Sequence, residues 1–286
     1  MTLRKRTPWF LLVPLGVFLV ITYFYPMLYQ ILLSFEEQTL YTVEPHFVGL
    51  RNYIAVFQDP LFSTALKNAF LWTALSVLFQ VILGLLAALL LNIPRKGYKV
   101  FRNLSLLPFV LPPVAIAVTW KWLYNPLYGL INYFIVLLGG EPVNFLGRNL
   151  ALYSVTWVNI WKAFPFYALF ILAGLQSISQ DLYEAAYIDG AATWGVFRYI
   201  TLPLIRPLLL VMALFATVWT FNYFDLIYSM TQGGPGHTTE ILATLAYKTV
   251  FLKLRFDQAA TIGVFMFLVN FILSLVILLL SRRATT

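Results

Sequence analysis

The sequence predicts an all-α polytopic membrane protein with six transmembrane helices and both termini in the cytoplasm. Three observations lead to this fold class. First, the 286 residues are 61% hydrophobic and only 10% charged, whereas soluble domains carry about 25% charged residues. The chain therefore lacks the polar residues that a water-exposed surface needs. Second, six long segments hold no charged residue. Third, most Lys and Arg residues gather in alternate connecting segments, as the positive-inside rule describes.

Each uncharged segment fits one membrane-spanning helix, which needs about 20 mostly apolar residues. The fourth helix has to extend upstream past Lys162 to reach that length. We expect helices over residues 9–33, 68–92, 104–124, 152–178, 206–228 and 260–281. A further uncharged run at 122–140 is interrupted by Gly and Pro, so it predicts only a short interfacial helix. Residues 1–286 then form a single transmembrane domain.

Orientation follows from the positive charges. With the N-terminus inside, the inner segments hold eleven cations and only three acids, Asp181, Glu184 and Asp189. The inner cations are Arg4, Lys5, Arg6, Arg95, Lys96, Lys99, Arg102, Arg198, Arg206, Arg282 and Arg283. The other eight cations face eight acids, so the whole net charge of +8 lies on one side. This asymmetry predicts cytoplasmic termini and explains the basic composition without nucleic acid.

Proline positions indicate breaks within the spans. Pro112 and Pro113 are expected to kink the third helix, and Pro165 the fourth. Such breaks leave backbone groups unpaired, which the membrane tolerates only beside protein or a watery cavity. The breaks therefore favour a pathway over a simple anchor.

Catalytic chemistry is not expected. The chain has no Cys, which excludes a disulfide, a thiolate metal site and a Cys nucleophile. His46 and His237 lie in outer loops without metal-ligand spacing. No G-x-x-x-x-G-K-[ST] phosphate loop occurs, so ATP hydrolysis would need a partner. We expect no catalytic residue and no metal site.

The segment between the fourth and fifth helices, about residues 179–206, is named here the elbow segment. Asp181 and Glu184 sit in the first turn of a short helix, where the helix dipole favours acids. Gly190 can end that helix, a second short helix follows, and Pro203 starts the next element. Two short helices with a sharp bend suit a groove on another protein. An ordinary amphipathic connector is the alternative.

The elbow segment resembles the EAA loop of ABC importer permeases, whose pattern is E-A-A-x-x-D-G-A followed by F-x-x-I-x-L-P. The matching residues are Glu184, Ala185, Ala186, Asp189, Gly190, Ala191, Phe197, Ile200, Leu202 and Pro203. Residues 47–53 resemble the F-x-G-L-x-N-Y of sugar-importer permeases, and residues 231–235 are similar to their T-x-G-G-P turn. The carbohydrate-uptake branch, with the maltose and glycerol-phosphate permeases, is the most similar. The maltose permease's extra N-terminal helices and large periplasmic insertion are missing here.

This resemblance implies the type I ABC importer permease fold in the cytoplasmic (inner) membrane. It also implies a heterodimer with a second homologous permease, two ATPase subunits that use ATP and Mg, and an extracytoplasmic solute-binding protein. The chain itself would hold no cofactor. Coupling to the ATPase is expected from Glu184, Ala185, Ala186, Asp189, Gly190, Ala191, Arg198 and Pro203. The binding protein would contact the outward loops at 36–66, 125–150 and 229–259.

Intramembrane polar residues indicate where substrate binds, because ionisable groups are costly there. The expected substrate contacts are Asn159, Lys162, Phe166, Thr220, Asn222, Tyr223 and Asp225. For Lys162, a structural ion pair or snorkelling to the interface is an equal alternative. Gln80 and Asn270 are polar too, but we expect them to form helix–helix hydrogen bonds.

The expected function is ATP-driven uptake of a sugar, a di- or oligosaccharide, by alternating access. A glycerol-3-phosphate or polyol-phosphate permease is the alternative, but a dianion requires more cations than one Lys near an Asp. An ion-driven secondary transporter would place unpaired acids at the midplane, and Asp225 is the only intramembrane acid. An intramembrane enzyme would need paired Asp, HExxH or Ser–His groups, which are missing.

Overall fold

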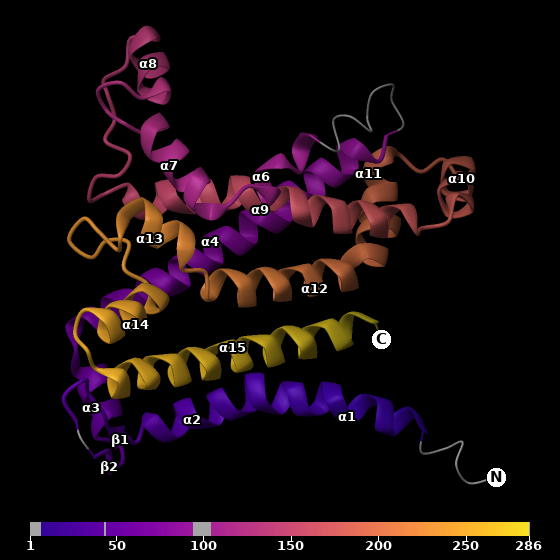
Figure 1. Ribbon diagram of the computed structural model, residues 1–286. Helices are drawn as coiled ribbons and strands as arrows, with labels where there is room; N and C mark the ends of the chain where they lie inside the picture. The colour runs from indigo at the N-terminus through magenta and orange to yellow at the C-terminus, as the bar shows by residue number, and fades with distance from the viewer. Residues whose placement is uncertain (1–6, 43, 94–103, 286) are drawn as a thin grey trace. The chain divides into compact units, whose positions relative to one another are not determined.

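The computed structural model describes residues 7–42, 44–93 and 104–285, and helices dominate them (Figure 1). The chain divides into two compact units. Unit 1 comprises residues 1–63 and 245–267, and unit 2 comprises residues 64–244 and 268–286. Seven of the inner cations, namely Arg4, Lys5, Arg6, Arg95, Lys96, Lys99 and Arg102, lie outside the described residues.

The first part of the chain forms a long helix followed by a small hairpin. Its elements are α1 (Thr7–Leu19), a π-helical turn (Val20–Phe24), α2 (Tyr25–Leu33), β1 (Glu36–Glu37), β2 (His46–Phe47) and α3 (Arg51–Gln58). The strands are antiparallel, with Glu36 opposite Phe47. The later helices α14 (Leu242–Phe251) and α15 (Phe256–Thr285) contribute their residues 245–251 and 256–267 to this unit.

Unit 2 contains most of the long helices. In chain order its elements are α4 (Pro60–Leu91, from residue 64), α6 (Leu107–Val110), α7 (Pro113–Leu123), α8 (Leu130–Leu137), α9 (Ala151–Gln176), α10 (Gln180–Ile188), α11 (Thr193–Val196), a π-helical turn (Phe197–Thr201), α12 (Leu202–Phe221) and α13 (Asp225–Thr231).

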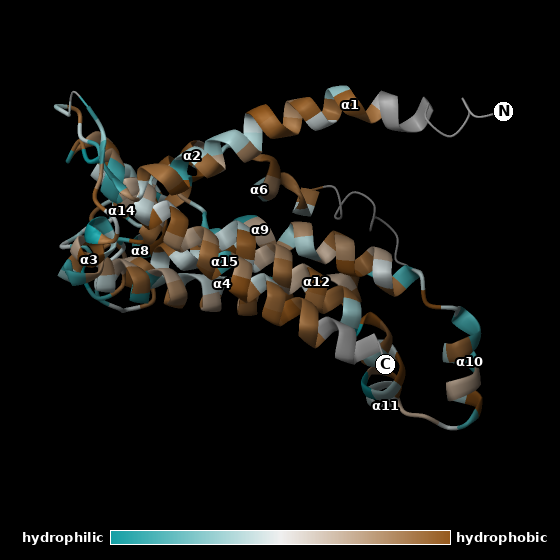
Figure 2. Ribbon diagram, turned by 90° about the horizontal axis from the view of Figure 1, so that it is seen from below, coloured by the Kyte–Doolittle hydropathy of each residue, from teal (hydrophilic) through white to brown (hydrophobic). Residues whose placement is uncertain are grey.

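Five helices of the described residues are long and apolar enough to cross a membrane. They are Leu12–Leu33, Pro60–Leu91, Ala151–Gln176, Thr193–Phe221 and Phe256–Leu280. Apolar residues run along most of their length in Figure 2. These five helices lie over five of the six expected spans, and they establish a polytopic all-α membrane fold.

The third expected span, 104–124, is not one continuous helix. It is divided into α6 and α7, and the residues between them, Leu111 and Pro112, have extended backbone with ψ of 140° and 137°. Each of these two residues precedes a proline, and a residue before proline is disfavoured in the α conformation. The two successive prolines therefore break this helix rather than kink it.

The fifth expected span also has different bounds. The sequence predicts a separate short helix and a new element from Pro203, but α11, the π-helical turn and α12 form one helix from Thr193 to Phe221. Pro203 removes one backbone N–H, and the π-helical turn just before it absorbs the mismatch. The helix ends at Phe221 rather than 228, where the Asn222 side chain donates to the Val218 carbonyl.

The core of unit 2 lies where α4, α9 and α12 meet. Its buried residues are Ala88, Leu91, Tyr167, Ile171, Leu172, Leu175, Ile205, Met212 and Ala216. Gly84 allows the helices to approach closely, because a Cβ at this position would lie 2.9 Å from the Tyr167 Cβ. Small residues at such crossings are typical of helix packing in membranes, where close van der Waals contact supplies much of the association energy.

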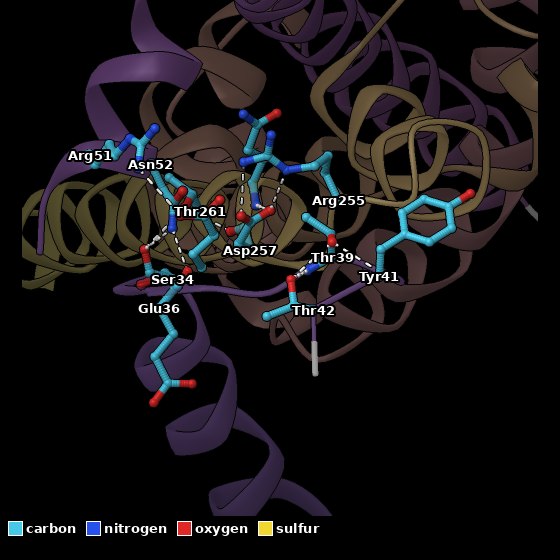
Figure 3. Close-up of polar contacts among 12 residues, drawn as sticks. Ser34, Glu36, Thr39, Tyr41, Thr42, Arg51, Asn52, Arg255, Asp257 and Thr261 are labelled. Atoms are coloured by element: carbon cyan, nitrogen blue, oxygen red, sulfur yellow. Dashed lines mark hydrogen bonds and ion pairs between the residues drawn. The ribbon is translucent and has the colours of Figure 1, made fainter. Parts of the chain in front are cut away.

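Unit 1 is held together by a polar cluster (Figure 3). The buried Asn52 donates to the carbonyls of Ser34 and Glu36, at 3.1 and 2.7 Å. Arg255 donates two hydrogen bonds to the fully buried Asp257 carboxylate. These hydrogen bonds raise the pKa of the Arg255 guanidinium above its ordinary value. The cluster ties the end of α2 and the start of α3 to one another, and it anchors the start of α15.

Candidate functional site

A cavity of about 270 Å³ opens among the helices of unit 2. Six of the seven expected substrate residues line it: Asn159, Lys162, Phe166, Thr220, Tyr223 and Asp225. The other lining residues are Gln80, Phe109, Pro113, Ala163, Tyr167 and Trp219. Aromatic rings and a few converging polar groups are the composition expected of a small-molecule site.

Two breaks in helical backbone border this cavity. Phe109 and Pro113 flank the break between α6 and α7, and Tyr223 lies in the break between α12 and α13. Non-helical backbone at membrane depth is stable only where protein or a water-filled cavity covers it. Discontinuous helices also form the substrate sites of many transporters. The prolines of the third span had indicated such a cavity, and the structure places it beside them.

Lys162 of α9 reaches the first of these breaks. Its Nζ donates to the Phe109 carbonyl oxygen at 3.1 Å and lies 5.3 Å from the centre of the Phe109 ring. The Phe109 ring in turn stacks on Phe166, with 4.8 Å between ring centres and 24° between planes. Lys162 and Asp225 line the same cavity but form no ion pair with one another. The predicted alternative of a structural ion pair is therefore not what Lys162 forms.

Two buried oxygens of the cavity have no hydrogen-bond partner among the described residues. They are Gln80 Oε1 and the Tyr223 hydroxyl. The Gln80 side chain is only 1% exposed, and an unsatisfied buried polar group costs about 1–3 kcal/mol. The prediction that Gln80 forms a helix–helix hydrogen bond is wrong. The sequence does show that Gln80 is a polar residue among apolar neighbours, which could have indicated a binding residue. It does not show that this side of α4 faces the cavity.

Further hydrogen bonds hold the cavity wall. Asn159 of α9 donates to the Ser76 hydroxyl of α4 at 3.1 Å, and both residues are buried. The Trp72 indole N–H donates to the Thr220 carbonyl at 3.0 Å. These contacts join α4 to α9 and to the end of α12.

Asn222 is the one expected substrate residue that does not line the cavity. Its side chain is exposed, and its amide Nδ2 donates to the Val218 carbonyl. Its Oδ1 accepts a hydrogen bond from Asn270 at 3.2 Å. Asn270 thus forms the expected helix–helix hydrogen bond, while Asn222 shapes the end of α12.

The elbow segment is built around Gly190. Ser179 caps α10 by accepting a hydrogen bond from the Asp181 N–H. At the other end, Gly190 has φ of +80° and donates to the Tyr187 carbonyl, and Ala191 donates to the Ala186 carbonyl. This pair of hydrogen bonds is the Schellman motif, which favours glycine because the left-handed conformation is strained for other residues.

The elbow segment has an exposed surface. Glu184, Ala185, Asp189, Gly190, Arg198 and Pro203 are exposed, and Ala186 and Ala191 are half-buried. Large apolar side chains are exposed beside them: Leu182, Tyr187, Ile188, Trp194 and Tyr199. Within the chain, a hydrogen bond of 3.3 Å between the hydroxyls of Tyr183 and Thr201 joins α10 to the helix that follows. An exposed mixture of charged, small and aromatic residues on a polar segment is a candidate protein-binding surface.

The other two motifs have structural roles in the described residues. Asn52 and Tyr53 of the first motif contact Ser34, as the polar cluster of unit 1 requires. In residues 231–240, the hydroxyls of Thr231 and Thr239 lie 2.7 Å apart, and Asn68 donates to two carbonyls of the same loop. Both motifs therefore stabilise loops rather than line the cavity.

The broken helices, the cavity and the elbow segment together define a membrane transport component. The chain belongs to the family of binding-protein-dependent transport system inner membrane components, whose model matches residues 80–286. It is therefore a multi-pass protein of the cytoplasmic membrane.

Characterised relatives cover most of the chain. It is 38% identical over 247 residues to the trehalose/maltose transport system permease protein MalF of Thermococcus litoralis, covering 85% of this chain and 83% of that protein. It is 35% identical over 274 residues to the sulfoquinovosyl glycerol transport system permease protein SmoG of Agrobacterium fabrum, covering 95% and 89%.

A solved structure agrees with the fold. A bacterial ABC transporter involved in the import of the acidic polysaccharide alginate contains a chain that matches with a TM-score of 0.87 and 26% identity. The match covers 99% of this chain and 97% of that one. This is the ABC importer permease fold.

Proposed function

We propose that this chain is a permease subunit of an ATP-driven ABC importer that moves a sugar, a di- or oligosaccharide, by alternating access. The cavity of unit 2 is the observation that carries the proposal. It offers the stacked rings of Phe109 and Phe166 beside Gln80 Oε1 and the Tyr223 hydroxyl. A sugar has apolar C–H faces that pack on aromatic rings and hydroxyls that donate to unpaired oxygens.

The charge of the cavity favours a neutral sugar. Lys162 is the only cation among the described residues that line it, and the Phe109 carbonyl already accepts a hydrogen bond from the ammonium. Asp225 adds a carboxylate, which opposes any anionic ligand. Glycerol-3-phosphate is therefore the weaker alternative. The relatives are named for trehalose and maltose, for sulfoquinovosyl glycerol and for the acidic polysaccharide alginate, so the family alone does not select among these carbohydrates.

The chain supplies no energy of its own in this proposal. Two partner ATPases would use ATP and Mg, and the elbow segment would transmit their closure to the helices. Glu184 would meet a basic residue of an ATPase, and Gly190 would permit close backbone approach. A second homologous permease would complete the pathway, and a binding protein would deliver sugar to the outward loops at 36–66, 125–150 and 229–259. ATP and sugar would bias two orientations of the same bundle.

Reconstitution tests the substrate class. The chain is assembled in proteoliposomes with the permease, ATPases and binding protein encoded beside its gene. Uptake is measured with radiolabelled maltose, trehalose, an alginate oligosaccharide and glycerol-3-phosphate, with and without ATP. We expect ATP-dependent accumulation of a neutral sugar only. Uptake confined to the phosphate ester or to the acidic oligosaccharide would overturn the neutral-sugar assignment, and uptake without ATP would overturn the importer mechanism.

A further inference from the structure

Lys162 forms a contact within the protein that a residue binding the substrate would not need. In a continuous helix, the Phe109 carbonyl would accept a hydrogen bond from the backbone N–H of residue 113, four positions on. Residue 113 is Pro, which has no N–H, and the extended backbone at Leu111 and Pro112 separates the two turns. The Phe109 carbonyl is thus orphaned by the sequence, and Lys162 Nζ is the donor that reaches it, at 3.1 Å.

The same ammonium also interacts with the ring of the residue that it caps. Nζ lies 5.3 Å from the centre of the Phe109 ring, within the range of a cation–π interaction. Lys162 therefore fixes both the backbone and the side chain of Phe109. Because α6 has only four residues, its own hydrogen bonds hold it weakly, and contacts from α9 determine where it lies.

The position of Phe109 matters because its ring forms part of the cavity wall. Phe109 stacks on Phe166 at 4.8 Å, and Phe166 packs against Phe170 at 4.7 Å and against Tyr167 at 5.4 Å. The result is an aromatic shelf, defined here as Phe109 and Phe166, on one side of the cavity. Without the cap, the Phe109 carbonyl would lose its hydrogen bond to α9, and only ring contacts would hold Phe109 in its place on the shelf.

We infer that Lys162 is a positioning residue, which holds the aromatic shelf by replacing the N–H that Pro113 lacks, and that it does not contact the substrate directly. Only the use of this shelf by a sugar rests on the proposed function. The specificity of the cavity then comes from the aromatic shelf and from Gln80 and Tyr223. The positive charge of Lys162 stabilises the Phe109 turn instead of binding the substrate. This explains how a lone lysine can persist in a cavity suited to a neutral ligand.

The test compares three side chains at position 162. Lys162→Arg keeps charge and donors, Lys162→Gln keeps a donor without charge, and Lys162→Met keeps neither at a similar length. Lys121→Met is the matched control, because Lys121 is an exposed lysine of α7 that does not line the cavity. Each full-length variant carries 4-fluorophenylalanine at position 109 and is assembled with its partner subunits in lipid nanodiscs. The fluorine NMR signal reports the stacking of that ring, and equilibrium binding is measured with radiolabelled maltose and trehalose.

We expect Lys162→Met to shift or broaden the fluorine signal and to weaken sugar binding about tenfold or more, the loss typical of a hydrogen bond from a charged donor. Lys162→Arg should restore both readouts, Lys162→Gln should restore them in part, and Lys121→Met should change neither. An unchanged fluorine signal in Lys162→Met overturns the inference, whether or not binding is lost, because a direct ligand would act without moving Phe109. If the wild-type protein binds neither sugar, the proposed function fails, while the fluorine signal still decides the role of Lys162.

Discussion

Two residues of the cavity lower the stability of the protein but offer hydrogen-bonding atoms to a ligand. Gln80 keeps an unpartnered oxygen in a buried position, although a buried polar atom without a hydrogen bond lowers stability. Tyr223 does the same with its hydroxyl. Two such atoms facing one cavity are most simply explained by a ligand that completes their hydrogen bonds when it binds. We therefore predict that removing either polar atom raises the stability of the protein without ligand and weakens the binding of the ligand.

Gln80→Met tests this balance. Met fills a similar volume without polar atoms, so the thermal unfolding midpoint of the detergent-solubilised chain should equal or exceed that of the wild type, because replacing an unsatisfied group with an apolar one is nearly neutral or stabilising. Transport of the sugar should fall about tenfold, the loss of one good hydrogen bond to substrate. Thermal scanning and uptake assays measure the two effects.

The matched control is Thr73→Val. Thr73 Oγ1 is also buried without a hydrogen-bond partner among the described residues, but Thr73 does not line the cavity. This variant should match Gln80→Met in stability and retain wild-type uptake. Equal uptake by the two variants would contradict the role of Gln80.

At the scale of elements, the bends and breaks in the helices are the informative features. The two prolines of the third span create the break that opens the cavity, and the Gly190 turn sets α10 at an angle to the helix that follows it. A regular helix would satisfy its own backbone and leave no cavity or projecting turn. These irregular features are local and are encoded by few residues, which makes single substitutions decisive.

Glu184→Lys and Gly190→Asp should each abolish ATP-driven transport while ATP hydrolysis by the partner subunits becomes independent of substrate. The first reverses the charge of an exposed side chain, and the second places a side chain where close backbone approach to a partner is expected. Asp at φ of +80° strains the backbone by about 1–2 kcal/mol, and a Cβ at Gly190 meets no described residue within 4 Å apart from its chain neighbours. The folded permease should therefore survive.

Controls come from the expected outer face. Gly139 has φ of +84° and equally open surroundings, so Gly139→Asp imposes the same backbone strain without touching the elbow segment. Glu141→Lys reverses an exposed charge in the same loop. Because the 125–150 loop is a proposed binding-protein contact, the readout is co-purification with the ATPase subunits, which both controls should retain at the wild-type level while Glu184→Lys and Gly190→Asp weaken it. Loss of co-purification in Gly139→Asp as well as in Gly190→Asp would mean that strain, rather than a partner contact, explains the defect.

At the scale of the whole molecule, the charge asymmetry predicts which side of the membrane each loop faces. By the positive-inside rule we expect the elbow segment in the cytoplasm and the loop between α7 and α8 outside. Since the chain has no Cys, a single introduced thiol can report on either face. Leu127 and Ile188 are suitable positions because their side chains are 90% and 85% exposed.

Leu127→Cys should react with a membrane-impermeant maleimide in intact spheroplasts. Ile188→Cys should react only after the membrane is permeabilised, and the Cys-free parent should not react in either condition. The similar exposure of the two side chains makes the reaction rates comparable. Labelling of Ile188→Cys in intact spheroplasts would reverse the orientation and remove the elbow segment from any cytoplasmic ATPase.

Much of the fold was predictable because membrane helices obey a simple rule. An apolar run of sufficient length must become a helix, since the bilayer leaves no other way to satisfy the backbone. The prediction of one kinked helix for the third span was wrong, because the length of an uncharged segment does not show whether two prolines kink a helix or divide it. The fifth was wrong at both ends, because a π-helical turn carried the helix through Pro203 and because Asn222 ended it at Phe221.

The cavity was predictable only in part for a similar reason. Polar residues within spans could be counted from the sequence, and six of the seven expected residues do meet. Which helix face each of them occupies depends on packing against other helices. The predicted roles of Gln80 and Asn222 were therefore reversed: Gln80 faces the cavity, and Asn222 forms a hydrogen bond with Asn270.

The sequence by itself determined the membrane class, the number of apolar runs and the position of the Gly190 turn, because each depends on composition or on one residue's backbone preference. The tertiary structure decided that Phe109 and Gln80 share a cavity with Tyr223, and that Lys162 caps the carbonyl that Pro113 leaves without a donor. These relations join residues that are distant in sequence, and only the packing of α4, α6, α9 and α12 brings their side chains within a few ångströms.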